Sequence, residues 1–284
     1  MKTISDMPSK LPYLNLGCGS HFNKLWVNID FSKTGEGVIA HNLLNGIPFD
    51  DNMFEVVYHS HVLEHFPKDK AIDFILECYR VLKPGGIIRI AVPDLEQIVK
   101  NYSRLLDLGK TQPENERLRV DYDWIMIEMY DQMVRNISGG EMLKYIAKQK
   151  LDNEDFVYER IGHEGQMIRE GVINSINRQA IKASSYHKIR NIISPRNYKD
   201  LFFKLFFKNE YQLIKLSRFR LSGEIHQWMY DIYSLGNLLR DVGFKKIEKK
   251  GFDHSSIPEW RSFSLDEINN EIRKPDSLFV EGIK

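Results

Sequence analysis

The chain has 284 residues, of which 42% are hydrophobic and 28% charged, and its formal net charge is +1 at pH 7. These values are ordinary for a soluble globular protein, and they exclude a global electrostatic attraction to nucleic acid. The chain has no run of 18 apolar residues and no signal-peptide core, so a cytoplasmic location is expected. Cys18 and Cys78 are too few for a disulfide framework, and we expect two reduced thiols.

The first hundred residues alternate short β-branched runs with helical patterns, which is typical of parallel strands joined by crossovers. A helix is predicted at residues 72–82, ended by Pro84-Gly85-Gly86. After Pro93, Asp94 and Gln97 predict a capping box at the start of a second helix, which extends to residue 105. Strands are predicted at 13–17, 26–30, 37–42, 54–60 and 86–93.

Residues 103–226 lack a strand rhythm and predict a mostly helical insertion, with breaks at residues 138–140, 162 and 194–195. The core domain would then consist of residues 11–102 together with 227–284. In the second part of the core, Ser234 is expected to cap a helix that Gly243 ends. Two further strands are predicted at 244–252 and 276–283.

The charge is uneven within the insertion. Residues 178–220 contain eleven Lys or Arg against two acids, and they include the apolar run LFFKLFF at 201–207. Three interpretations fit this stretch: a core helix with solvated lysines, a lid over an anionic substrate, or a helix in peripheral contact with a membrane surface.

Polar or glycine residues lie at the ends of the first four predicted strands, where ligands bind in open parallel sheets. They are Gly17-Cys18-Gly19, Asp30, Asn42-Leu43 and His59-Ser60-His61. A GxG turn followed at strand spacing by an acid indicates adenosine. Phe22 stands where a dinucleotide fold needs its third glycine, and only nine residues separate Gly17 from Trp26. The pattern therefore favours S-adenosylmethionine over a dinucleotide.

The strings LNLGCG, WVNID, NLLNGIPFDDNMFEVVYHSHVLEHF and RVLKPGG, in this order and spacing, resemble the class I S-adenosylmethionine-dependent methyltransferases. The tail pieces HQWMYDIYSLGNLLRDVGF and SSIPEWRSFSLD are similar to a subgroup associated with bacterial surface-glycan pathways. The resemblance implies an α/β, doubly wound, Rossmann-like sheet of seven strands that is mostly parallel, with the last strand antiparallel. It also implies a role in polysaccharide biosynthesis.

The same resemblance implies the cofactor contacts. Gly17 and Gly19 would face the methionine part, Asp30 the ribose, and Asn42 with Leu43 the adenine. Asn15 stands where the family usually has an acid, and the helix after the glycines is shortened. The full predicted cofactor set is Asn15, Gly17, Cys18, Gly19, Asp30, Asn42, Leu43 and Ser60.

The expected reaction is methyl transfer to an oxygen, less readily a nitrogen, of a small-molecule acceptor. A sugar hydroxyl would need a general base, for which His61 is the first candidate and His226 the second. The acceptor is predicted to be a sugar, a nucleotide-sugar or a phosphorylated metabolite, and not a nucleic acid. Its predicted contacts are Arg190, Arg196, Arg218, Arg220 and Tyr230.

Other functions fit parts of the pattern. His61-Val62-Leu63-Glu64-His65 is an H-x-x-E-H string, as in zinc proteases, but such a string needs a helix. A predicted strand precedes it and Pro67 follows it, so we expect no metal. A non-catalytic binding protein with the same fold and a nicotinamide-dependent sugar oxidoreductase remain alternatives.

Overall fold

The computed structural model describes residues 11–182, 207 and 210–284, and its centre is a seven-stranded sheet in the order β3-β2-β1-β4-β5-β9-β6. Strand β9 pairs antiparallel with both β5 and β6, and the other pairings are parallel. The predicted fold class is therefore confirmed. The strands are β1 (Tyr13–Leu16), β2 (Val27–Asp30), β3 (Val38–Ala40), β4 (Phe54–Ser60), β5 (Leu82–Pro93), β6 (Lys245–Lys250) and β9 (Ser277–Ile283).

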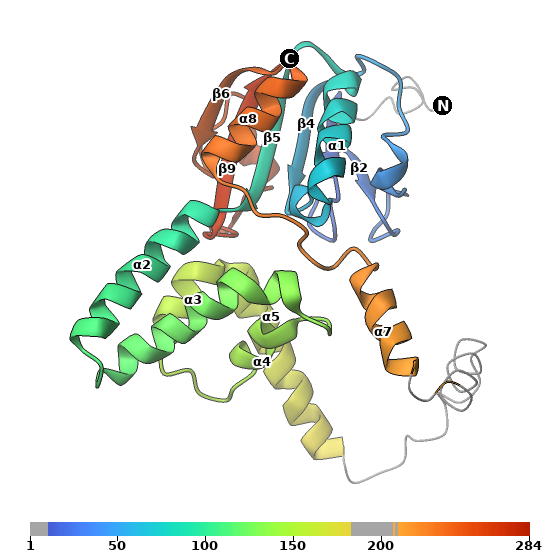
Figure 1. The fold of residues 1–284 in the computed structure, drawn as a ribbon. Helices are drawn as coiled ribbons and strands as arrows, with labels where there is room; N and C mark the ends of the chain where they lie inside the picture. The colour runs from blue at the N-terminus through green and yellow to red at the C-terminus, as the bar shows by residue number, and fades with distance from the viewer. Residues whose placement is uncertain (1–10, 183–206, 208–209) are drawn as a thin grey trace.

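Helices α1 (Lys68–Val81) and α8 (Ile232–Val242) pack on one face of the sheet (Figure 1). Helix α8 starts earlier than predicted. Asp231 is its N-cap and Ser234 occupies the third helical position, where the two residues form a capping box. Gly243 ends the helix at φ 112°, a left-handed conformation that glycine adopts without strain.

The opposite face of the sheet is covered by a loop with aromatic side chains. All residues between β1 and β2 are described and none is helical, so the crossover helix is absent and not merely shortened. In its place, the segment that carries the 3-10 helix η4 (Trp260–Phe263) packs on the sheet. The buried members of this cluster are Trp26, Val56, Tyr58, Ile257, Trp260, Phe263 and Leu265.

Arg89, fully buried on β5, fastens that loop to the sheet. Its guanidinium pairs with Asp266 and with Glu281, each at 2.8 Å, and lies 4.3 Å from the Trp260 ring centroid. It also donates hydrogen bonds to the carbonyl groups of residues 251, 252 and 254. A charge is tolerated in a protein interior when it is paired and hydrogen-bonded in this way.

The insertion is helical where the structure describes it, and it has a hydrophobic cluster of its own around Trp124 and Ile125. Gly139 and Gly140, both at positive φ, separate two of its helices, and Gly162 kinks a third at φ 61°. The break predicted at 194–195 lies outside the described residues. The helices are α2 (Leu95–Thr111), α3 (Glu116–Val134), α4 (Gly140–Ile146), α5 (Glu154–Lys182) and α7 (Tyr211–Arg220).

Helix α2 links the core to the insertion and runs across the boundary expected at residue 102. Asp94 Oδ1 accepts from the backbone N–H groups of Glu96 and Gln97, as predicted for an N-cap. The predicted capping box is incomplete, because the side chain of Gln97 instead bonds the Pro275 carbonyl and Arg160. Among the helices that the structure describes, none is both long and apolar enough to span a bilayer.

Two short strands, β7 (Glu267–Ile268) and β8 (Glu271–Ile272), form a hairpin that the sequence analysis missed. The hairpin follows Asp266, whose carboxylate accepts hydrogen bonds from both Arg89 and the Tyr58 hydroxyl. It therefore connects the aromatic cover of the sheet to the segment before β9.

We predict that Arg89→Met lowers the free energy of unfolding by about 3–5 kcal/mol, because Asp266 and Glu281 would be left as buried, unpaired carboxylates. Urea denaturation checks this value. Arg104→Met, on the exposed side of α2, is the matched control and should change stability by less than about 0.5 kcal/mol. Equal stability of the two variants would show that the Arg89 network is dispensable.

Candidate functional site

The predicted cofactor glycines lie at the carboxyl end of β1, beside the ends of β2 and β4. Gly17 adopts φ 62°, and a Cβ atom there would lie 2.3 Å from Val62 Cγ2, so this position needs glycine. Gly19 adopts φ 56°, and no atom lies within 4 Å of the Cβ position. The loop therefore presents bare backbone to open space at the edge of the sheet.

Asp30 ends β2 and holds this loop. Its Oδ2 accepts from the Gly19 N–H at 2.8 Å, and its Oδ1 accepts from the Ser32 N–H at 3.2 Å. A carboxylate has further lone pairs on both oxygens, and the side chain is partly exposed. Asp30 can thus organise the glycine loop and still accept hydrogen bonds from a ribose diol.

Two other members of the predicted cofactor set lie beneath the loop surface. Asn15 is buried, and its amide donates to Asn28 Oδ1 at 3.2 Å within the sheet. Cys18 is also buried, and burial together with the charge of Asp30 raises the pKa of its thiol to about 11. Both side chains are buried at the base of the glycine loop, and their predicted contact with the cofactor stays a prediction.

The end of β3 is organised by Asn42. Its Oδ1 accepts from the Leu44 N–H at 3.0 Å and caps the 3-10 turn η2 (Leu43–Asn45), while Leu43 packs against the core. Two apolar side chains that the sequence analysis missed, Phe31 and Leu44, are 74% and 65% exposed. Both residues follow the ends of predicted strands. The feature of the sequence that could have indicated Phe31 is an apolar residue directly after Asp30.

We predict that Asp30→Ala weakens binding of S-adenosylmethionine by roughly 1–3 kcal/mol, because the ligand loses an acceptor and the Gly19 loop loses its anchor. Titration calorimetry measures the dissociation constant. Asp73→Ala, in an exposed ion pair on α1, should leave it unchanged. Equal affinity of Asp30→Ala and wild type would overturn the assignment of Asp30 to the ribose.

His61 lies in the turn that follows Ser60, the last residue of β4. Its backbone adopts φ 54°, and its N–H donates to the Ala91 carbonyl at 2.9 Å. The ring is held on two sides, with Nε2 2.8 Å from Ser277 Oγ and Nδ1 3.3 Å from Glu64 Oε1. Burial and nearby cations lower the pKa of His61 well below its ordinary value, so the ring is neutral at physiological pH.

Glu64 is fully buried in the 3-10 turn η3 (Leu63–His65), and its carboxylate receives no hydrogen bond from the described residues. Burial raises the pKa of this carboxyl to about 8. Its backbone carbonyl accepts from the N–H groups of Gln227 and Trp228, at 2.6 and 3.3 Å. The turn after β4 is therefore joined directly to the segment that returns from the insertion.

His226, the second predicted base, is buried behind this turn. Its Nε2 lies 4.0 Å from Glu64 Oε1, and its ring meets the ring of His65 edge-on at 4.8 Å. Its backbone N–H donates to the Gln132 carbonyl on α3. His226 does not line the cavity described next, and this position does not suit a base for an acceptor bound there.

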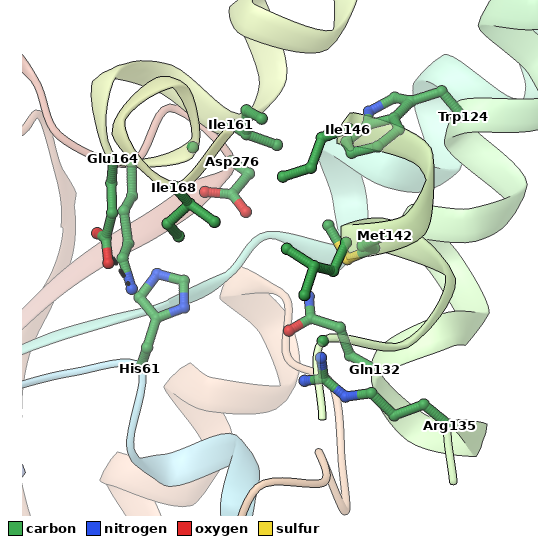
Figure 2. A pocket seen from close by; sticks show the side chains of 14 residues that line it. His61, Trp124, Gln132, Arg135, Met142, Ile146, Ile161, Glu164, Ile168 and Asp276 are labelled. Carbon is green, nitrogen blue, oxygen red and sulfur yellow. Dashed lines mark ion pairs between the residues drawn. The ribbon is translucent and has the colours of Figure 1, made fainter. Parts of the chain in front are cut away.

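A cavity of about 240 Å³ opens between the core and the insertion, with His61 in its wall (Figure 2). The insertion side is mostly apolar, whereas the core contributes His61, Lys274 and Asp276. Glu164 lies 3.6 Å from Lys274, and Arg135 lies 3.8 Å from Glu224. The lining residues are His61, Trp124, Gln132, Arg135, Gly139, Met142, Leu143, Ile146, Ile161, Glu164, Gly165, Ile168, Lys274 and Asp276.

The predicted acceptor contacts are not in this cavity. Arg218 and Arg220 are exposed on α7, where Arg220 contacts Asn136, and Tyr230 is buried in the core. Arg190 and Arg196, with residues 201–206 of the apolar run, lie outside the described part of the chain. The cations of the cavity are Arg135 and Lys274, which the sequence analysis missed. For Lys274, the feature of the sequence that could have indicated it is the charged string Lys274-Pro275-Asp276 before the last strand.

Residues 14–90, from β1 into β5, match the family model described as a methyltransferase domain. This part of the chain is therefore similar to a methyltransferase domain. The match agrees with the predicted cofactor, S-adenosylmethionine, and disfavours the nicotinamide alternative. The open Gly19 backbone and the Asp30 carboxylate suit that cofactor.

The chain is also similar to individual proteins. The chain is 40% identical, over 83 residues, to the protein named "Probable methyltransferase ltbC" of Aspergillus luteorubrus; these residues are 28% of each chain. Two solved structures of S-adenosylmethionine-dependent methyltransferases are similar to it, each at 12% identity. That from Archaeoglobus fulgidus has a TM-score of 0.38, covering 99% of this chain and 90% of its own. That from Thermotoga maritima has a TM-score of 0.35, covering 96% and 81%.

Asp276 gives the protein a measurable pH dependence of stability. Burial and the charge of Glu128 raise the pKa of Asp276 from 3.8 to about 6, so the folded protein binds this proton more tightly than the unfolded chain. The stabilisation is present below about pH 4 and is lost as the pH rises through about 6. Asp276→Asn should therefore gain roughly 1–3 kcal/mol relative to wild type between pH 4 and pH 7. Urea unfolding at both pH values measures this change, and a pH-independent difference would contradict it.

Proposed function

We propose that the protein transfers a methyl group from S-adenosylmethionine to an oxygen of a small acceptor bound in the cavity between core and insertion. One observation supports this most: His61 lies both at the carboxyl end of β4, beside the cofactor loop, and in the cavity wall. A group at that position can reach the boundary between cofactor and acceptor.

The cofactor would be held by the Gly17–Gly19 backbone, by Asp30 at the ribose, and by Phe31 and Leu44 against the adenine. When bound, it supplies an electrophilic sulfonium methyl group. The protein then has to align the acceptor oxygen with this methyl and to exclude water, which are the main contributions of a site of this kind. The apolar wall formed by Trp124, Ile146 and Ile161 serves both purposes.

The acceptor's hydroxyl proton would pass to His61. The neutral ring has one nitrogen lone pair, and the ring is held between Ser277 Oγ, 2.8 Å from Nε2, and Glu64 Oε1, 3.3 Å from Nδ1. The contact of Nε2 with Ser277 Oγ, at 2.8 Å, would have to give way to the acceptor hydroxyl if this nitrogen takes the proton. In this arrangement His226 supports the loop and does not act as the base.

The volume and the lining of the cavity limit the kind of acceptor that can bind there. Its volume of about 240 Å³ is below the roughly 300–1,000 Å³ of sites for drug-sized ligands, so a monosaccharide-sized molecule fits better than a whole nucleotide-sugar. The apolar wall suits the carbon face of a ring, and Arg135 and Lys274 suit a carboxylate or phosphate on it. A role in surface-polysaccharide biosynthesis is supported by the sequence resemblance alone.

The proposal is tested with isotope-labelled S-adenosylmethionine and a panel of monosaccharides, sugar acids, sugar phosphates and nucleotide-sugars, with the products identified by mass spectrometry. On the acceptor found, His61→Ala should lower turnover roughly a hundred- to ten-thousandfold, because it removes general-base help. Affinity for the cofactor should change little, because the loss arises in the transition state. His254→Ala, at an exposed surface histidine, is the matched control.

The outcomes separate the rival functions. Cofactor binding with no methylated product in any class would favour the non-catalytic binding protein, whereas nicotinamide binding in its place would favour the oxidoreductase. If His61→Ala kept full turnover and His226→Ala lost it, the base would have to be reassigned to the returning segment.

A further inference from the structure

The turn after β4 and the segment that returns from the insertion bring three metal-ligating side chains together. One ligand atom from each of Glu64, His65 and His226 lies within 4.8 Å of the other two. Glu64 and His226 are buried, and His65 is partly buried. The first two residues belong to the H-x-x-E-H string, and His226 is the third ligand that the sequence did not reveal.

The carboxylate of Glu64 is the most unusual member of this cluster. It is fully buried and aimed at the histidines, yet it accepts no hydrogen bond and pairs with no lysine or arginine among the described residues. Ionising a buried carboxyl group is costly unless a cation or hydrogen-bond donors compensate the charge. A metal ion between Glu64 and the two histidines would supply that compensation.

The tautomer of His65 suits a ligand. Its Nδ1 lies 3.3 Å from the Ile225 carbonyl, and a carbonyl only accepts, so Nδ1 carries the proton. In the neutral ring this leaves the Nε2 lone pair available. A histidine whose other nitrogen donates to a backbone carbonyl is the usual arrangement in metal sites, because the outer contact fixes the orientation of the ring.

The distances between the ligand atoms are short enough for the three side chains to bind one ion. Zinc bound at about 2.0–2.1 Å in a tetrahedral site separates its ligand atoms by about 3.3 Å. The separation between His226 Nε2 and Glu64 Oε1 is 4.0 Å, so side-chain rotation alone could bring these atoms to the ion. The same Oε1 lies 3.3 Å from His61 Nδ1, and its second lone pair can keep that contact while the first binds the ion.

We propose that Glu64, His65 and His226 bind one divalent transition-metal ion, with zinc the best fit to two imidazoles and one carboxylate. The fold differs from that of H-x-x-E-H proteases, because the ligands come from a 3-10 turn and a distant segment. The ion would clamp the turn after β4 to the returning chain, next to His61. The proposal replaces the expectation of no metal drawn from the sequence, and it does not depend on the proposed methyl acceptor.

The test uses the full chain without an affinity tag, loaded with equimolar zinc sulfate and dialysed, followed by elemental analysis. We expect about one zinc per chain in the wild type, together with a raised melting temperature. Cobalt(II) in place of zinc should give the visible absorption of a low-coordinate site. His226→Ala and the nearly isosteric Glu64→Gln should weaken zinc binding more than about a hundredfold, beyond the range for outer contacts. The surface variant His254→Ala should retain the metal.

Two results would overturn the proposal. One is wild-type protein that keeps no zinc and shows no change in melting temperature. The other is a folded Glu64→Gln or His226→Ala variant that keeps zinc as tightly as the wild type. Neither measurement needs S-adenosylmethionine or an acceptor, so failure here leaves the proposed methyl transfer to its own experiment.

Discussion

The junction of core and insertion depends on Glu64. Its backbone carbonyl holds Gln227 and Trp228, and its carboxylate faces His61 at 3.3 Å and His226 at 4.0 Å. The returning segment then reaches α3, because the His226 N–H donates to the Gln132 carbonyl. A buried carboxyl group in this position constrains its neighbours. A movement that brought no hydrogen-bond donor to the group would leave its desolvation cost unchanged. A movement that let water reach the group would separate the core from the insertion. The wall of the acceptor cavity is therefore fixed by the same turn that ends the cofactor edge.

Most of the sheet and the cofactor edge could be predicted because their signals are local. Runs of strand-forming residues bounded by glycine, proline and acids locate β1, β2, β4 and β5, at most ends to within a few residues. The parallel topology of the sheet then places Gly19 near Asp30, before any contact between them is known. The errors were also local. Either Asp231 or Ser234 could cap α8, and both side chains are used there, but the first of them begins the helix. A strand-end pattern does not give the exposure of a side chain, and it therefore could not show that Asn15 is buried and that Phe31 is 74% exposed.

The acceptor side could not be predicted because its contacts join residues that are far apart along the chain. Glu64 meets His226 across 162 positions, and the His61–Ser277 contact spans 216. No periodicity or spacing encodes such pairs, and the insertion between them has only generic helical patterns. Basic composition indicated the charged stretch 178–220, most of which lies outside the described residues. The cations that line the described cavity are the isolated residues Arg135 and Lys274.

The absent crossover helix after β1 explains why this domain needs an unusual cover. The chain passes from Gly17 to Trp26 in an irregular loop, so one face of the sheet must be shielded by residues from elsewhere. The loop before β7 does this with Trp260 and Phe263, and Arg89 anchors it through Asp266. Since that loop continues through the β7–β8 hairpin to Lys274 and Asp276, its anchoring also sets where those two side chains enter the cavity. The shielding of the sheet and the geometry of the acceptor site are thus carried by one continuous segment. A substitution that loosened the Trp260 layer would be expected to alter both the cavity and the loop between β1 and β2, because His21 and Asn23 of that loop contact the carbonyl groups of Ser264 and Phe263.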